Sequence, residues 1–145
     1  GLDWEAHPPK ELWRRPVGPG WSSFAVVGDY CFTQEQRGEQ EAVVCYAVAT
    51  GEQVWINLTD ARFVERMGNG PRATPTFNKG LLYTQGATGI LQCIDAATGS
   101  TKWQRNIADD AATRIPTWGF CSSPLVVNDL VITYSAAGDG KSLLA

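Results

Sequence analysis

Apolar and polar positions follow the same pattern three times along the chain. The segments SSFAVVGDYCFTQ (22–34), ATPTFNKGLLYTQ (73–85) and SSPLVVNDLVITY (122–134) align without gaps, and they begin 51 and 49 residues apart. Each has small residues, a short apolar run, a two-residue break and a second run rich in large apolar side chains. Because two such runs around a short break are typical of a β-hairpin, each segment is predicted to form two strands.

A second motif follows the first two hairpins. CYAVATGEQVW (45–55) and CIDAATGSTKW (93–103) carry Cys, Thr-Gly and Trp at the same offsets, 48 residues apart. We interpret each as a strand, a tight turn and a further strand that bears the tryptophan. Gly51, after Thr50, and Gly99 suit the turn because glycine adopts a positive φ without steric cost.

Other residues of the motif also have structural roles in this interpretation. The Asp95 carboxylate is expected to accept hydrogen bonds from backbone N–H groups two or three residues later, and the Thr98 hydroxyl to add another. Trp55 and Trp103 recur once per unit and offer large apolar faces with an indole N–H. We therefore expect them to join neighbouring units and not to bind a ligand.

These motifs divide the chain into repeating four-stranded units. The first complete unit spans about residues 22–58 and the second about 73–107. Residues 11–17 resemble the last strand of a preceding unit, and residues 121–145 begin another unit. A period near 48 residues is typical of repeat architectures, so residues 1–145 are predicted to form one partial repeat domain.

The second motif is similar to the repeat signature Ala-x-Asp-x-x-Thr-Gly-x-x-x-Trp of β-propellers of the pyrroloquinoline quinone (PQQ) type. Cys93 takes the place of Ala in one copy, and Ala47 takes the place of Asp in the other. This family includes quinoprotein alcohol dehydrogenases and the outer-membrane assembly scaffold BamB. The resemblance implies an all-β fold of about three four-stranded antiparallel blades in an incomplete ring. It also implies that the chain is a piece of a longer protein, because such rings close with more blades.

Composition and charge exclude some functions. The chain has 145 residues, 43% of them hydrophobic, and no periodic helix of useful length. A net charge of −3 and a pI near 5.1 argue against nonspecific nucleic-acid binding, which needs a basic surface. No apolar run approaches the length of a membrane-spanning helix.

The cysteines and the histidine do not suggest a metal site. Cys31, Cys45, Cys93 and Cys121 form no C-x-x-C pair, and equivalent positions in neighbouring units are expected to be too far apart for a disulfide. We expect free thiols, buried where they lie in strands. The single histidine, His7, cannot form a zinc site alone.

No catalytic residue is predicted in this segment. Within the PQQ family, the dehydrogenases hold PQQ against a disulfide of adjacent cysteines and bind calcium; this chain has no Cys-Cys pair and no acidic cluster with calcium-loop spacing. The sequence therefore favours a non-enzymatic binding or scaffold domain without a cofactor. From the resemblance, we place it in the bacterial periplasm or outside the cell. The alternatives are a fragment of a PQQ-dependent dehydrogenase, with PQQ and calcium, and a sensor domain.

Two long loops carry the candidate binding residues. TDARFVERMGNGPRA (59–73) and ADDAATRIPTWGFCS (108–122) connect one unit to the next, and long loops on rigid scaffolds often bind ligands. Arg72, Arg114 and Trp118 are the predicted ligand-binding residues, for an anion or a peptide. Alternatively, Trp118 caps the core of a blade and Arg72 forms a salt bridge within its loop.

The expected partner is a protein, a peptide or the remaining blades of the full-length chain. The terminal faces, near Trp13 and near residues 130–138, are expected to expose apolar surface. We therefore also predict self-association of the isolated chain.

Overall fold

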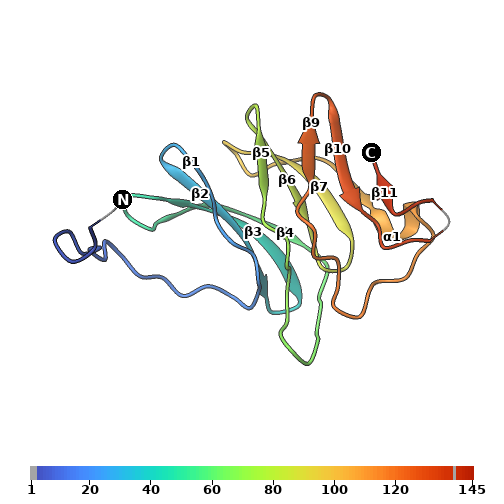
Figure 1. Cartoon of the computed structure of the whole chain (residues 1–145), viewed down its shortest axis with the longest axis horizontal. Coiled ribbons are helices and arrows are strands. Elements are labelled where there is room, and N and C mark those ends of the chain that lie inside the picture. The colour runs from blue at the N-terminus through green and yellow to red at the C-terminus, as the bar shows by residue number, and fades with distance from the viewer. Residues whose placement is uncertain (1–2, 139) are drawn as a thin grey trace.

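Three antiparallel sheets lie side by side in the order of the chain (Figure 1). The structure, a computed structural model, describes residues 3–138 and 140–145. The strand orders are β1-β2-β3-β4, β5-β6-β7-β8 and β11-β10-β9. The elements are β1 (Ala25–Val27), β2 (Tyr30–Arg37), β3 (Gln40–Ala47), β4 (Gln53–Thr59), β5 (Thr76–Asn78), β6 (Leu81–Gln85), β7 (Ile90–Asp95), β8 (Thr101–Asn106), α1 (Ile107–Asp110), β9 (Leu125–Val127), β10 (Leu130–Tyr134) and β11 (Leu143–Leu144).

The sequence repeat appears directly as repeated sheets, and the predicted all-β class is confirmed. Strands β1, β5 and β9 begin at residues 25, 76 and 125, so their spacings of 51 and 49 match those of the hairpin segments. Two residues separate the strands of each hairpin, and Lys79 and Gly80 in the second turn both have positive φ. The one-turn helix α1 is the only helix among the described residues, and no described helix is long and apolar enough to cross a membrane.

The recurring Cys and Trp occupy directly opposed positions on neighbouring strands. Cys45 on β3 pairs with Trp55 on β4, and Cys93 on β7 pairs with Trp103 on β8. In both sheets the register shifts immediately after this pair, as it does at a β-bulge. A small side chain opposite each indole leaves room for the ring, which explains why the two residues recur together.

Each of two tryptophans packs against the turn of the following sheet. The Trp55 indole N–H donates to the Ala96 carbonyl at 3.1 Å, and the Trp55 ring lies over Gly99. A β-carbon on Gly99 would lie 2.7 Å from the ring. Trp13 repeats this contact one sheet earlier, since its N–H donates to the Val48 carbonyl at 2.7 Å and its ring lies over the turn after β3.

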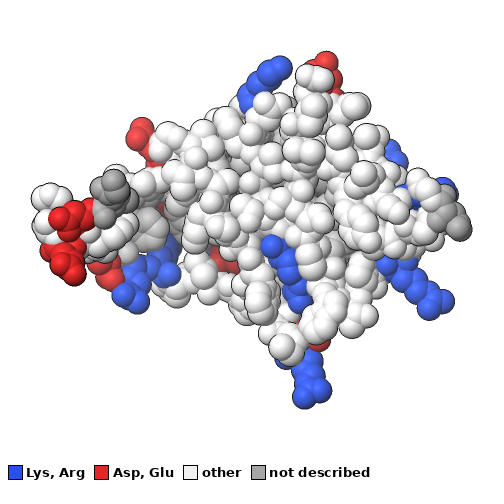
Figure 2. All heavy atoms as spheres, viewed as in Figure 1, with Lys and Arg blue, Asp and Glu red and all other residues white. Residues whose placement is uncertain are grey.

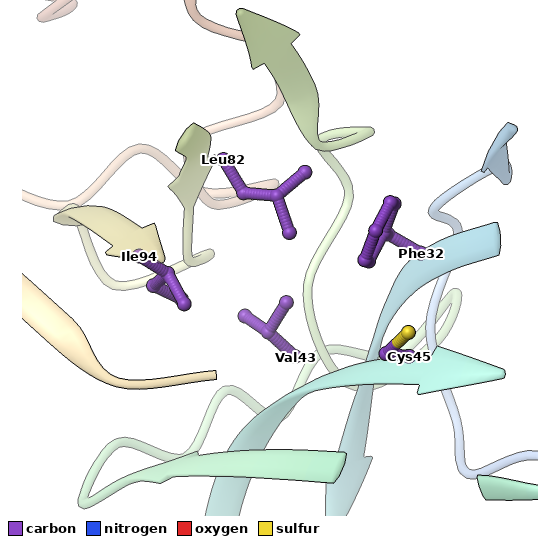
Figure 3. Packing of buried hydrophobic residues seen from close by; sticks show 5 residues of the cluster. All are labelled: Phe32, Val43, Cys45, Leu82 and Ile94. Carbon is purple, nitrogen blue, oxygen red and sulfur yellow. The ribbon is translucent and has the colours of Figure 1, made fainter. Parts of the chain in front are cut away.

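An apolar cluster fills the space between the first two sheets. In Figure 3, Phe32 and Val43 of the first sheet point toward Leu82 and Ile94 of the second. All four are at most 4% exposed, and Cys45 completes the cluster. A second cluster, which includes Phe120, joins the second and third sheets. The sheets are therefore held face to face by apolar burial.

The N-terminal segment covers the outer face of the first sheet without forming a strand. The sequence predicts a strand in residues 11–17, but these residues have no β-pairing. In the two four-stranded sheets, the fourth strand pairs with the third strand of the same sheet. Residues 3–10 form no strand, so residues 11–17 have no such neighbour to pair with. The segment instead packs through Trp13 and through Arg15, which lies over the Tyr46 ring at 5.4 Å. Trp13 is thereby partly covered, whereas Leu12 and Val17 of the same segment are exposed.

The opposite end of the sheet array is less covered. Leu125, Val127, Tyr134 and Leu143 of the third sheet are exposed apolar or aromatic side chains. The third sheet has only three strands, so no tryptophan-bearing fourth strand follows β11 within the described residues. Self-association through this face stays a prediction.

The contact between Trp55 and Gly99 can be tested with a matched pair of substitutions. Gly99→Ala and Gly80→Ala both place alanine at a similar positive φ, 76° and 83°, which costs about 1 kcal/mol or slightly more in each. Only Gly99→Ala collides with a neighbour, because nothing lies within 4 Å of a β-carbon at Gly80. The collision should cost a further 1 to 3 kcal/mol, roughly, in the free energy of unfolding measured in urea. Equal losses would show that the ring does not rest on this glycine.

Candidate functional site

The loops that precede β5 and β9 lie at the same end of the sheets. Residues 60–75 connect β4 to β5, and residues 111–124 connect α1 to β9. Both loops descend to the lower edge of Figure 1, away from the hairpin turns at the upper edge. We call this end of the molecule the loop face, defined by these two segments.

Phe63 anchors the first loop and brings it to the second. Its backbone N–H donates to the side-chain carbonyl of Gln36 at 3.0 Å, and its carbonyl accepts from the Gly70 N–H at 3.0 Å. The buried ring lies against the second loop, 3.3 Å from the position of a β-carbon on Gly119. The two loops therefore pack on one another and on the sheets.

Arg72 is part of this anchor and does not point freely into solvent. Its guanidinium donates to the carbonyl of Gly68 at 2.7 Å and to the carbonyl of Gly70. Its central carbon lies 4.4 Å from the centre of the Phe63 ring, a cation–π distance. The described hydrogen-bond partners of Arg72 are both backbone carbonyls. The alternative hypothesis had instead expected a salt bridge within the loop.

Trp118 lies on the surface of the second loop, and its neighbour takes the buried position. Trp118 is 55% exposed, whereas Phe120 is 2% exposed and packs with Leu91 and Ile107. Gly119 has a φ of 73° and reverses the chain between the two aromatic residues. Phe120, and not Trp118, thus caps the core of the second sheet.

Arg114 is exposed on the same loop as Trp118, four residues before it. It has no ion pair within residues 3–138 and 140–145, unlike Arg105, whose ion pair with Asp110 at 2.7 Å lowers the pKa of that carboxyl. The structure therefore separates the three predicted residues. Arg114 and Trp118 share one exposed loop, while Arg72 belongs to the buried support of the other.

Charged side chains on the visible face lie around its upper central part and below it. Figure 2 shows a broad uncharged area over β5, β6, β9 and β10, with Lys, Arg, Asp and Glu side chains around it. A basic side chain projects where the first loop reaches its lowest point. A basic and an acidic side chain also lie near the middle of this face, directly below the uncharged area.

The sequence did not indicate an apolar groove between the first two sheets at the hairpin end. It has a volume of about 310 Å³. Its lining is mostly apolar and includes Val27, Tyr30, Phe32, Cys45, Val54, Trp55, Phe77, Gly80, Ala96 and Ala97. The corresponding groove one sheet later, of about 220 Å³, contains Asn78, Lys79 and Asp129. Because the lining comes from several separate segments, no local motif could have revealed it.

Burial makes three of the four thiols poor nucleophiles. Cys31, Cys45 and Cys93 are buried and free, and Cys121 is exposed and free. Burial, with a smaller effect of Cys31, raises the pKa of Cys45 to about 11, so its thiolate is disfavoured. Among the residues that the structure describes, no group of three or more His, Cys, Asp or Glu could hold a metal ion.

Comparison with known proteins identifies relatives of the whole fold. A family model described as "Outer membrane protein assembly factor BamB" matches residues 6–144. The structure resembles a europium-containing methanol dehydrogenase, with a TM-score of 0.59, 15% identity and coverage of 81% of this chain and 20% of that one. It also resembles the quinohemoprotein alcohol dehydrogenase ADHIIG from Pseudomonas putida HK5, with a TM-score of 0.56, 22% identity and coverage of 83% and 17%.

A third similar structure is BamB from Moraxella catarrhalis. Its TM-score is 0.51 and its identity 16%, over 81% of this chain and 46% of that one. This chain thus spans less than half the length of each of the three proteins. The comparison with curated proteins gave no match. The similarities establish the fold, a part of a PQQ-like propeller, and leave the function to be argued from the residues.

Two arginine substitutions test which of the two side chains stabilises the loop face. Arg72→Met removes two hydrogen bonds from a charged donor and should lower the free energy of unfolding by about 2 kcal/mol. Arg114→Met, the matched control, should change it by less than about 0.5 kcal/mol because that side chain is exposed. Urea unfolding measures both values. A larger loss for Arg114→Met would contradict the assignment of Arg72 as the anchor.

Proposed function

Since the chain belongs to the family of outer membrane protein assembly factor BamB, a family of PQQ-like β-propellers, we propose that it is a non-enzymatic binding or scaffold domain. The observation that carries this proposal is the construction of the loop face. A pair of loops that pack on one another at Phe63 and Gly119 holds Trp118 and Arg114 in solvent. Exposed aromatic and arginine side chains on a rigid support are the residues that contribute most to protein interfaces.

The proposed partner is a protein segment with acidic and apolar side chains. Trp118 offers a flat apolar surface, and Arg114 offers a guanidinium that can bind a carboxylate with two hydrogen bonds. Val64, Met67 and Ile115 are further exposed apolar residues in the same two loops. A mixture of methionine, aromatic and arginine residues is typical of the centre of a protein interface.

We place this activity in the bacterial periplasm. The support is the family itself, whose description refers to assembly of outer membrane proteins. A partner in that compartment would approach the sheets from the loop face. The partner could also be another part of the full-length protein, because this chain spans only part of its relatives' length.

The alternative function is that of a segment of a PQQ-dependent alcohol dehydrogenase. Two of the similar structures are a methanol dehydrogenase and a quinohemoprotein alcohol dehydrogenase. The residues of this chain do not fit PQQ and calcium, because its four cysteines are all free and the described residues offer no cluster for a metal. No reaction step is therefore assigned to them.

Photo-crosslinking in cells tests the loop face directly. A benzophenone amino acid placed at position 118 of the full-length protein should crosslink to a protein segment, and Arg114→Glu should suppress that crosslink through charge repulsion. Position 4 is the matched control, since Trp4 is also an exposed tryptophan, 58% against 55%, outside the loop face. The proposal fails if position 118 gives no crosslink or if position 4 gives the same one.

Titration with PQQ and calcium tests whether the chain is instead a segment of a dehydrogenase. We expect no saturable heat when PQQ and calcium are added to this chain in a calorimeter, because its sequence has no pair of adjacent cysteines and the described residues contain no metal-binding cluster. Circular dichroism before and after the titration would show that the chain is folded. A stoichiometric complex at micromolar concentration would favour the dehydrogenase.

A further inference from the structure

We propose that the joint between the first two sheets is controlled by a proton on Glu41: the joint closes at the loop face when this carboxyl is neutral and loosens when it is charged. The proposal concerns the scaffold itself and does not depend on the identity of any partner. It rests on the position of one carboxyl group from the first sheet, which is buried against the backbone of the second.

Glu41 lies near the start of β3 and reaches across to the segment between β6 and β7. Its Oε1 accepts a hydrogen bond from the backbone N–H of Ala87 at 3.0 Å. Its Oε2 lies against Gly86, where a β-carbon would collide with it. Glu41 is 5% exposed, so the carboxyl is enclosed by this contact. Both carboxyl oxygens therefore lie at the joint, and Oε1 is hydrogen-bonded there.

The joint has an apolar half and a polar half. The cluster of Phe32, Val43 and Leu82 forms the apolar half, and Glu41 lies beyond it at the loop end of β3. Next to the carboxyl is a cavity of about 10 Å³, enough for one water molecule. The groups that line it include Gln34, Thr59 and Gln92 besides Glu41 itself.

Few charges face this carboxyl. β2 presents Gln34, β4 presents Thr59 and β7 presents Gln92, none of which is charged. The loop before β5 presents Arg72, whose positive charge favours the carboxylate. Burial opposes the carboxylate more strongly than Arg72 and the Ala87 N–H favour it, and the pKa of Glu41 is raised to about 7.

The direction of the pH effect follows from the raised pKa. In an open joint the carboxyl is hydrated and ionises near its ordinary value of 4.5. The closed joint therefore binds the proton more tightly, and its extra stability is complete below about pH 4.5 and lost as the pH rises through about 7. The apolar half does not titrate, so it should act as the hinge while the loop end opens.

The loop face is coupled to this joint through its anchors. Phe63, which joins the two loops, is held by Gln36 on β2, and Glu41 pairs with Gln36 in the sheet. Arg72 acts on Glu41 and also holds the carbonyls of its own loop. Opening at Glu41 should consequently loosen the first loop as well.

Hydrogen exchange at single amides tests the proposal on the intact chain. After correction for the intrinsic rate, the protection of the Ala87 amide should fall on the order of 50-fold between about pH 5 and pH 8. The Gly70 amide, which donates to the Phe63 carbonyl, should follow it in the same direction. In Glu41→Gln the acceptor remains without the charge, so protection at both amides should be independent of pH.

Glu35→Gln is the matched control. Glu35 is also buried, at 1% exposed, but its carboxylate faces the N-terminal segment and accepts from the Gly18 N–H. This variant should retain the pH dependence at Ala87. The proposal is overturned if wild-type protection does not change with pH, or if the change persists in Glu41→Gln.

A second measurement needs no substitution. The carbon-13 shift of the Glu41 side-chain carboxyl in the wild-type chain should titrate with a midpoint near 7. A midpoint near 4.5, the ordinary value, would overturn the proposal even if Glu41→Gln failed to fold.

Discussion

The contact of an indole ring with a glycine of the next sheet determines how the rest of this molecule is arranged. Trp55 lies over Gly99, and its N–H bonds to the carbonyl of Ala96. The indole thus fixes both the distance and the orientation between successive sheets. A side chain at Gly99 would collide with this ring, so either the indole or the turn would have to shift. Trp13 makes the same contact from a segment that forms no strand, so the contact does not require a complete preceding sheet.

The interface between the first two sheets has an apolar end that packs closely and a polar end that positions the loops. Its hairpin end is apolar, and close packing there resists shear between the sheets. Its loop end contains buried polar groups that include Glu41 and Gln36, whose side chains accept from the backbone N–H groups of Ala87 and Phe63. Apolar contacts are non-directional, whereas hydrogen bonds specify geometry. The polar end can therefore place the loops accurately, at the cost of sensitivity to any change in its charge.

The same architecture occurs in enzymes and in an assembly factor, and our proposal for this chain corresponds to the second use. The similar dehydrogenases and BamB share the fold at 15–22% identity, so the sheets themselves do not decide the activity. On the loop face of this chain, Arg72 holds its own loop by hydrogen bonds to carbonyls. Trp118 and Arg114 are exposed to solvent. The proposed interaction surface needs well-placed side chains more than it needs reactive groups.

The sequence by itself determined the repeat, the hairpin strands and the turns, because these depend on local periodicity and on glycine at positive φ; the strand that it predicted in residues 11–17 does not form. It also indicated that Trp55 joins neighbouring units, since a large residue that recurs once per unit has a structural cause. Only the tertiary structure decided that Phe120 is buried and Trp118 exposed, because a reversal of the chain at Gly119 separates two aromatic residues of similar character. It alone placed Glu41 against Ala87, 46 residues away. A carboxyl in a sequence carries no sign of burial; its environment is made by segments that meet only when the sheets close.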